Sequence, residues 1–171
     1  MKIRTDSVNA AVKERRKKRR RIFAYILVSA ASLYVVLFLL SLIIVNGYDS
    51  VKYRSGGWMV TEITTIDLKN GSGHISYHSD ISEGRDFETD ITVSENDLRE
   101  LKIKMAFALV PFWSSEYVNP MIMDGDMWGF HFYRGDSEKS VYGSNAYPFG
   151  YGMITRLLYE LENEAAQNLQ G

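Results

Sequence analysis

Three histidines and two carboxylates stand at alternating positions of predicted strands. His74 and His78 lie in "GHISYHS", Glu88 and Asp90 lie in "RDFETDITV", and His131 lies in "DMWGFHFYR". Because successive side chains of a strand point to opposite faces, all five project away from the apolar residues of their strands. Neighbouring strands would bring imidazoles and carboxylates together, an arrangement that can bind a metal ion or transfer a proton. This face supports one hypothesis, a surface-anchored hydrolase or metal-dependent enzyme.

The spacing of these residues matches no metal-binding or catalytic motif. An antiparallel sheet with one face in water also shows polar side chains at alternating positions. The chain has no cysteine, which excludes thiol nucleophiles and cysteine-ligated zinc. We therefore favour the interpretation as a solvated polar face, and we predict no catalytic residue, no metal ligand and no cofactor.

An aromatic loop is the most distinctive stretch of the C-terminal half. Three tyrosines and a phenylalanine cluster with Asn, Pro and three glycines in "VYGSNAYPFGYG". Aromatic rings with polar tips suit contacts with sugars or peptides. The alternative is that these rings fill the core and fix the loop before the last helix. The residues that we predict as a possible ligand-contact loop are Tyr142, Asn145, Tyr147, Phe149 and Tyr151.

The elements that must position these residues follow the order βββ-α-ββ-α. Alternation and turn residues such as Asn70-Gly71 predict the strands, which are residues 58–68, 73–79, 85–93, 126–134 and 140–145. Apolar stripes at spacings of three and four predict one helix from Ser94 to near Val110 and another after residue 151. We predict an α+β fold in which an antiparallel sheet carries both helices on one face.

Residues 22–45 form an apolar run, "IFAYILVSAASLYVVLFLLSLIIV", without charge, proline or glycine. A helix rises about 1.5 Å per residue and a bilayer core is about 30 Å thick, so about 20 residues cross it. The run is longer than the apolar part of a cleaved signal peptide, and no small-residue cleavage site follows it. We predict an uncleaved signal-anchor helix over residues 22–46.

A basic segment precedes the apolar run. Residues 1–21 contain ten Lys or Arg and two acids, whereas residues 22–171 contain ten Lys or Arg and nineteen acids. Because positive flanks remain in the cytoplasm, we predict a cytoplasmic N-terminus and an extracytoplasmic C-terminal domain in a cell membrane. The segment can also bind anionic headgroups of the lipid bilayer. It has no interleaved aromatics and no recognition fold beside it, so we do not favour nucleic-acid binding.

The chain therefore divides into four parts. They are a basic cytoplasmic segment (1–21), a transmembrane helix (22–46), a juxtamembrane spacer (47–57) and an extracytoplasmic α+β domain (58–171). The outer part is long enough to bury a core without disulfides or metals. Its acidic balance favours cationic partners or divalent ions.

Residues 124–161, "DGDMWGFHFYRGDSEKSVYGSNAYPFGYGMITRLLYEL", resemble a pattern in small uncharacterised membrane-anchored extracytoplasmic proteins of bacteria. The shared features are a W-x-F-x-F/Y strand, a second strand ending in G-S-N-x-Y-P, and an amphipathic helix. The resemblance covers less than a quarter of the chain. It implies a bacterial envelope protein and carries over no catalytic residue.

Three functions are compatible with these features. We favour a single-pass membrane protein whose extracytoplasmic domain binds an envelope protein or another ligand. Clustering of His78, Glu88 and His131 within ligand distance of one another would favour the surface enzyme. A cytosolic-facing adaptor would use the basic segment to bind nucleic acid, with a strong dependence on salt.

Overall fold

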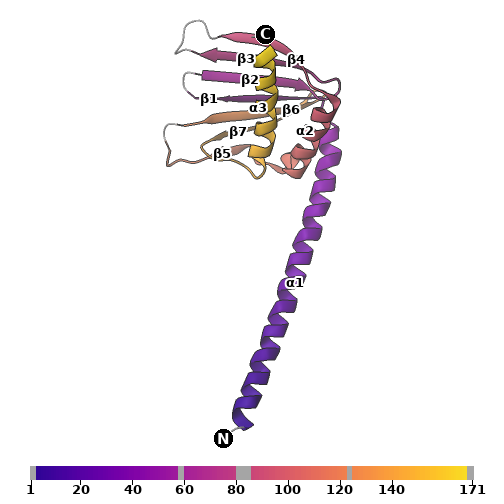
Figure 1. Cartoon of the computed structure of the whole chain (residues 1–171), viewed down its shortest axis with the longest axis vertical. Helices are drawn as coiled ribbons and strands as arrows, with labels where there is room; N and C mark the ends of the chain where they lie inside the picture. Colours follow the sequence, from indigo (N-terminus) through magenta and orange to yellow (C-terminus); the bar gives the residue numbers. More distant parts are fainter. Residues whose placement is uncertain (1–2, 58–59, 80–85, 123–124, 169–171) are drawn as a thin grey trace. The chain divides into compact units, whose positions relative to one another are not determined.

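The computed structural model describes residues 3–57, 60–79, 86–122 and 125–168. The chain separates into two compact units, Met1–Phe38 and Leu39–Gly171. Helix α1 (Ile3–Asn46; Figure 1) makes up the described part of the first unit, and its last turns belong to the second. Each unit is described in turn below.

The part of α1 from Glu14 to Asn46 is long and apolar enough to cross a membrane. Its apolar side chains, for example Ile26, Val28 and Leu33, are exposed rather than covered by protein. A core helix of a soluble domain would bury such side chains. By its length, composition and exposure, α1 is therefore compatible with the predicted single-pass anchor.

The second unit is built on a seven-stranded sheet with the order β4-β3-β2-β1-β6-β7-β5. Figure 1 shows β4 and β5 at opposite edges. The strands are β1 (Ser50–Gly56), β2 (Val60–Asp67), β3 (Ser72–Ser79), β4 (Phe87–Thr92), β5 (Glu116–Val118), β6 (Met127–Arg134) and β7 (Ser137–Ser144). Residues 58–59, which we predicted as the start of a strand, lie outside the described residues.

Two strands were missing from the predicted order. Residues 50–56, which we assigned to a spacer, form β1 and pair with both β2 and β6 at the centre of the sheet. Only Val51 and Tyr53 of β1 are buried, which is too short an alternation to predict a strand. Strand β5 has three residues and pairs with β7 in parallel. The sheet is therefore mixed, and our prediction of an antiparallel sheet was wrong at this edge.

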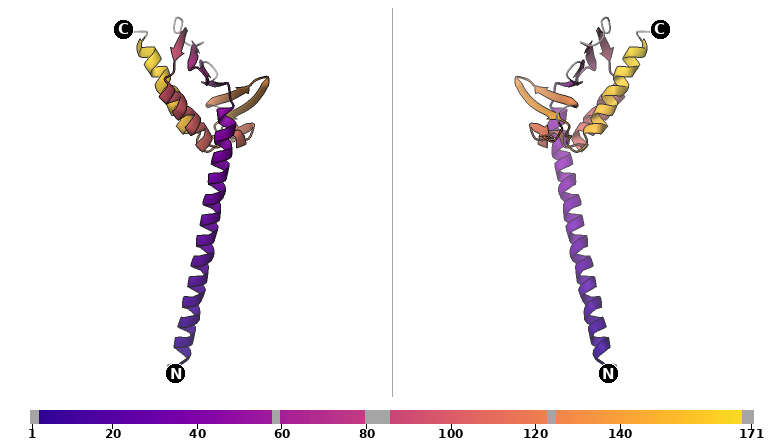
Figure 2. Two further views of the ribbon diagram at one scale, coloured as in Figure 1. Left: turned by 90° about the vertical axis from the view of Figure 1, so that its right-hand side faces the viewer. Right: turned by 90° about the vertical axis from the view of Figure 1, so that its left-hand side faces the viewer.

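Two helices lie on the same side of the sheet (Figure 2) and leave its other face open. They are α2 (Glu95–Phe107) and α3 (Tyr151–Asn168). Ser94 caps α2 as predicted, because its Oγ accepts a hydrogen bond from the Asp97 backbone N–H at 3.2 Å. Helix α2 ends earlier than we predicted. Leu109 adopts a left-handed φ of 56° and begins a short 3-10 turn, η1 (Val110–Phe112).

The core lies between the two helices and the sheet face that they cover, here called the helix face. Trp128, Phe130 and Phe132 are buried there, as their alternation with His131 predicts. The row of buried side chains continues from β6 to β1, because Phe132 lies opposite Val51. Fully burying one such side chain contributes about 1.5–3 kcal/mol, so this face supplies most of the stability of the unit.

Asp49 lies between α1 and β1 and is bonded to neighbouring segments of the sheet. Its backbone N–H donates to the Tyr133 carbonyl at 2.7 Å, and its own carbonyl accepts from the Leu68 N–H at 2.8 Å. One carboxylate oxygen accepts from the Gly135 N–H at 2.6 Å, and the other lies 2.6 Å from Lys69 Nζ. These bonds lower the pKa of Asp49. Asp49 therefore ties the turn after β2 and the turn after β6 to the end of α1.

We predict that replacing Gly143 or Gly129 by alanine changes the free energy of unfolding in different ways. A Cβ on Gly143 would lie 2.3 Å from the Trp128 ring, so Gly143→Ala should lower the free energy of unfolding by about 1–3 kcal/mol. A Cβ on Gly129 would have no neighbour closer than 3.8 Å, so Gly129→Ala should leave stability unchanged or raise it by up to about 1 kcal/mol. Urea unfolding of the full chain in detergent measures both. Equal losses would contradict the assignment of the two glycines to opposite faces.

Candidate functional site

Each histidine of the open face pairs with a carboxylate of its own. The Nδ1–carboxylate distances are 2.9 Å for His74 and Asp90, 2.7 Å for His78 and Asp86, and 2.5 Å for His131 and Glu138. All three pairs are exposed to solvent, where such interactions are weak. The open face therefore carries three separate pairs.

The cluster of His78, Glu88 and His131 that would favour the enzyme hypothesis is not assembled. His131 lies on β6 and His78 on β3, with β1 and β2 between them. Three strand spacings of about 4.8 Å place the two histidines at least roughly 14 Å apart. Among the residues that the structure describes, no three His, Asp or Glu side chains are grouped so that they could hold a metal ion. The geometry gives this hypothesis no support.

His131 also contacts a serine, but the arrangement is not that of a catalytic triad. Ser140 Oγ lies 3.1 Å from His131 Nδ1, and the Ser140 hydroxyl donates a hydrogen bond to Glu138 Oε1. In a triad the base contacts the nucleophile through one ring nitrogen and the carboxylate through the other. Here serine and carboxylate meet the same nitrogen, so the contact orients the imidazole instead of activating the hydroxyl.

The predicted ligand-contact loop is divided between the two faces of the sheet. Tyr147 and Tyr151 stack against Trp128 on the helix face, with ring centroids 6.2 and 4.7 Å from it. Asn145 adopts a left-handed φ of 52° and accepts a hydrogen bond at Oδ1 from the Asp126 backbone N–H at 3.2 Å. These contacts fix the loop before α3, which is the alternative that the sequence left open.

The two remaining residues of the predicted loop are exposed at different places. Phe149 packs against Phe107 at the end of α2, with ring centroids 6.0 Å apart. Tyr142 stands on the open face of β7. Of the five predicted residues, Tyr142 lines a groove on that face.

A groove of about 380 Å³ lies on the open face, across β1, β2, β5, β6 and β7. It exists because Gly129 has no side chain where its two cross-strand neighbours, Arg54 and Tyr142, both carry one. Met127 and Val118 add apolar walls that are about half exposed. We call this the open-face groove and define it by Arg54, Val118, Met127, Gly129, His131 and Tyr142.

Two nitrogen-bearing side chains face the open-face groove. Arg54 is exposed and has no ion pair among the described residues. His131 Nδ1 is held by Glu138, whereas Nε2 lies 4.0 Å from where a Cβ on Gly129 would stand. Nε2 is therefore directed at the floor of the groove. Among the described residues, no Asp or Glu lines the groove, and Arg54 is the one full charge that does, so the groove favours a ligand with an anionic group.

A second cavity of about 280 Å³ lies between α3 and strands β1 and β2. Glu62 and Glu162 line it, and the Thr64 hydroxyl donates a hydrogen bond to Glu162 Oε1. Burial raises the pKa of Glu62 and raises that of Glu162 to about 7. The two carboxyl groups also hydrogen-bond each other. This hydrogen bond lowers the pKa of Glu62 and raises the pKa of Glu162, which assigns a shared proton to Glu162.

A tyrosine pair connects this cavity to the aromatic loop. Tyr53 OH and Tyr151 OH lie 2.9 Å apart. Burial raises the pKa of both hydroxyl groups, so both stay neutral.

A carboxylic acid that is neutral near pH 7 can donate a proton in catalysis. In this protein, however, Glu162 is already bonded to Thr64 and Glu62, and these contacts hold α3 against β2.

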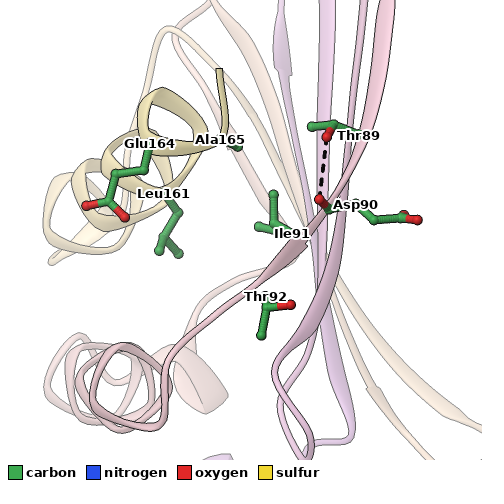
Figure 3. A pocket seen from close by; sticks show the side chains of 7 residues that line it. All are labelled: Thr89, Asp90, Ile91, Thr92, Leu161, Glu164 and Ala165. Atoms are coloured by element: carbon green, nitrogen blue, oxygen red, sulfur yellow. Dashed lines mark hydrogen bonds between the residues drawn. The ribbon is translucent and has the colours of Figure 1, made fainter. Parts of the chain in front are cut away.

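A third cavity, of about 300 Å³, lies between β4 and α3 (Figure 3). Ile91 and Leu161 point into it, whereas Asp90 points away from the helix and Glu164 points away from β4. The Thr89 hydroxyl donates to the backbone oxygen of Asp90 at 3.4 Å. This cavity has apolar surface but no converging polar groups. It is therefore less suited to ligand binding or catalysis than the open-face groove and the cavity beside Glu162.

Comparison with known proteins adds no family to these features. No family model matches the chain, and no curated protein matches its sequence. A fourth cavity, of about 620 Å³, is lined by Asp67, His74 and Asp90 on β2, β3 and β4. The choice among the four cavities therefore depends on their geometry. The open-face groove combines apolar walls with a cation that has no ion pair among the described residues, which is typical of a small-ligand site.

The sequence carried partial signals for residues that we missed. Glu162 falls on the apolar stripe of α3, one turn after Leu158, so its position predicts burial although its charge does not. Glu62 stands at alternate positions with Thr64 and Ile66 on β2, so its side chain lies on the same face as theirs. Arg54 had no such signal, because the strand that presents it was not predicted.

We predict that stability falls as pH rises through the range in which Glu162 ionises. Its pKa is raised from the ordinary 4.5 to about 7, so the folded state holds the proton more tightly than the unfolded state. The resulting stabilisation is fully present below about pH 4.5 and is lost as pH rises to about 7. Glu62, whose pKa is also raised, adds a change of the same sign.

Urea unfolding of the full chain in detergent, followed across this pH range, measures the effect. Glu162→Gln should flatten the profile, because it removes the titrating group. Glu160→Gln is the matched control, since Glu160 is exposed on the same helix. A profile that is the same in Glu162→Gln and in the unsubstituted chain would show that the pair does not control stability.

Proposed function

We propose that the chain is a single-pass membrane protein with a cytoplasmic N-terminus and an outer domain that acts as a ligand-binding module of the cell envelope. The open-face groove is its ligand site. The observation that carries this proposal is an apolar groove whose floor is a glycine and whose only full charge, among the residues that line it, is Arg54.

Two features support the membrane topology. The apolar part of α1 is long enough to cross a bilayer, and its N-terminal flank holds ten Lys or Arg in residues 1–21. Basic flanks are retained in the cytoplasm during insertion. The part of the chain that follows the apolar run, residues 47–171, then faces the other side.

The ligand class follows from the lining of the groove. Arg54 can form two parallel hydrogen bonds with a carboxylate or a phosphate. Val118, Met127 and the Tyr142 ring suit an apolar body. Residues 22–171 carry ten Lys or Arg and nineteen acids, but no acid lines the groove. We therefore expect a small molecule or chain end with an apolar part and one anionic group.

We predict that protease added to intact cells removes a tag fused after Gly171, because the proposed topology places the second unit outside. Immunoblotting of the tag, with a known outer site as control, measures the cleavage. In a matched variant the basic residues of segment 13–21 are replaced by neutral ones, which should reduce the fraction cleaved. A tag that survives until the membrane is opened would refute the orientation.

We predict that 3-phenylpropionate binds in the open-face groove. In the full chain in nanodiscs, with ¹³C-methyl-labelled methionines, it should shift the Met127 methyl signal in a saturable manner. Met121 is exposed elsewhere and serves as the internal reference. The uncharged 3-phenylpropanamide should shift Met127 less, because it cannot pair with Arg54.

Two variants separate the groove from general surface binding. Gly129→Leu fills the groove from its floor and should abolish the shift, and Arg54→Gln should weaken it several-fold. Ser76→Leu is the control, since it adds the same side chain to the same face on β3, with β2 between it and β1. Equal shifts in all three variants would exclude the groove as the binding site.

A further inference from the structure

Strand β4 stands at one end of the sheet, and among the described residues β3 is its one neighbouring strand. Directly after β4, the Val93 backbone N–H donates to the Gly71 carbonyl at 2.8 Å. Because hydrogen-bonded residue pairs alternate with non-bonded pairs in an antiparallel ladder, this bond and the register fix which positions face β3. The backbone N–H and carbonyl groups of Glu88, Asp90 and Thr92 therefore point to the outer edge.

The helix face of β4 is covered less completely than that of its neighbours. Ile66 on β2 and Ile75 on β3 have no exposed surface, whereas Phe87 and Ile91 on the same face of β4 are half-buried. The cavity between β4 and α3 lies beside Ile91, which points into it together with Leu161 (Figure 3). An apolar side chain on a further strand would extend over this cavity and cover Ile91.

The open face of the same edge is acidic. Glu88 and Asp90 alternate with the residues of the helix face, and both are exposed. The Asp90 side chain remains 92% exposed beside His74, and β4 contains no Lys or Arg. Opposite charges that face each other on neighbouring strands stabilise the pairing, and like charges destabilise it. A strand that adds to this edge is therefore favoured when it presents Lys or Arg to Glu88 and Asp90.

A second copy of the chain fits this edge poorly. Antiparallel pairing of two β4 strands about Thr89 would place Glu88 of each copy opposite Asp90 of the other. Pairing about Asp90 would place the two Asp90 side chains opposite each other. Like charges destabilise both arrangements, and charged edge strands prevent proteins from pairing with their own copies. The same charges select a partner strand of opposite charge.

We propose that β4 is a docking edge for an extended segment of a partner protein in which basic and apolar side chains alternate. The segment adds to the sheet as a further strand and bonds to the backbone of Glu88, Asp90 and Thr92. Its basic side chains pair with Glu88 and Asp90, and an apolar side chain covers Ile91 at the cavity. This inference goes beyond the proposed function, because no residue of β4 lines the open-face groove. It does not depend on the membrane topology, since β4 and α3 belong to one unit.

The probe is a synthetic peptide in which lysine and valine alternate, with both ends blocked and a fluorophore attached. Fluorescence anisotropy measures its binding to the full chain in nanodiscs of zwitterionic lipid, and a peptide with glutamate in place of lysine is the charge control. Thr92→Pro removes an outward N–H and keeps the bonds to β3, because proline is tolerated on the open side of an edge strand. Thr92→Val keeps that N–H and is the matched control. Glu88→Gln removes one carboxylate and leaves the backbone unchanged.

We expect saturable binding of the lysine peptide that is several-fold weaker in Thr92→Pro and in Glu88→Gln and unchanged in Thr92→Val. Equal affinities of Thr92→Pro and Thr92→Val would show attraction to the acidic surface without strand addition and would overturn the proposal. An unchanged affinity in Glu88→Gln, or equal binding of the glutamate peptide, would also overturn it. Self-association of the unsubstituted chain in light scattering, abolished by Thr92→Pro, would assign the edge to a second copy instead. Thermal unfolding verifies the fold of each variant, and Glu88→Gln decides the test if Thr92→Pro does not fold.

Discussion

The hydrogen bonds of Asp49 are the constraint on which the second unit depends. They join the end of the anchor helix to the turns after β2 and β6, two segments that are distant in sequence. Because Asp49 immediately precedes β1, these bonds fix where the first strand starts and therefore its register with both neighbours. The alternation of the two central strands then decides which side chains meet the helices and which remain on the open face.

The contrast between the two faces explains where ligand chemistry can occur. On the helix face, Gly143 makes room for the Trp128 ring, and the core closes over it. On the open face, Gly129 leaves a space between Arg54 and Tyr142 that no other side chain fills. The same residue type therefore serves close packing on one strand and an open groove on the next. The buried carboxyl pair, by contrast, belongs to the attachment of α3 to β2.

The sequence predicted those elements whose two faces differ chemically. Strand β6 was evident because aromatic residues alternate with His131, and α2 because Ser94 precedes an apolar stripe. Strand β1 was missed because its outward residues are charged and only Val51 and Tyr53 are buried. Glu62 and Glu162 were missed because charge suggests exposure, whereas their partners come from separate elements. The groove could not be predicted, since it depends on five strands and on the absence of a side chain at Gly129.

The central position of β1 has a consequence for biosynthesis. Strands β1 to β4 are contiguous in the chain, but the second neighbour of β1 is β6, which is made only after α2. If β1 to β4 pair before β6 emerges, β1 would be an open edge of a four-stranded sheet, and such edges pair readily with other chains. In the proposed topology that edge would be held at the membrane surface, because only Gly47, Tyr48 and Asp49 separate α1 from β1. We expect α1 then to act as a folding tether that keeps nascent sheets of different chains apart.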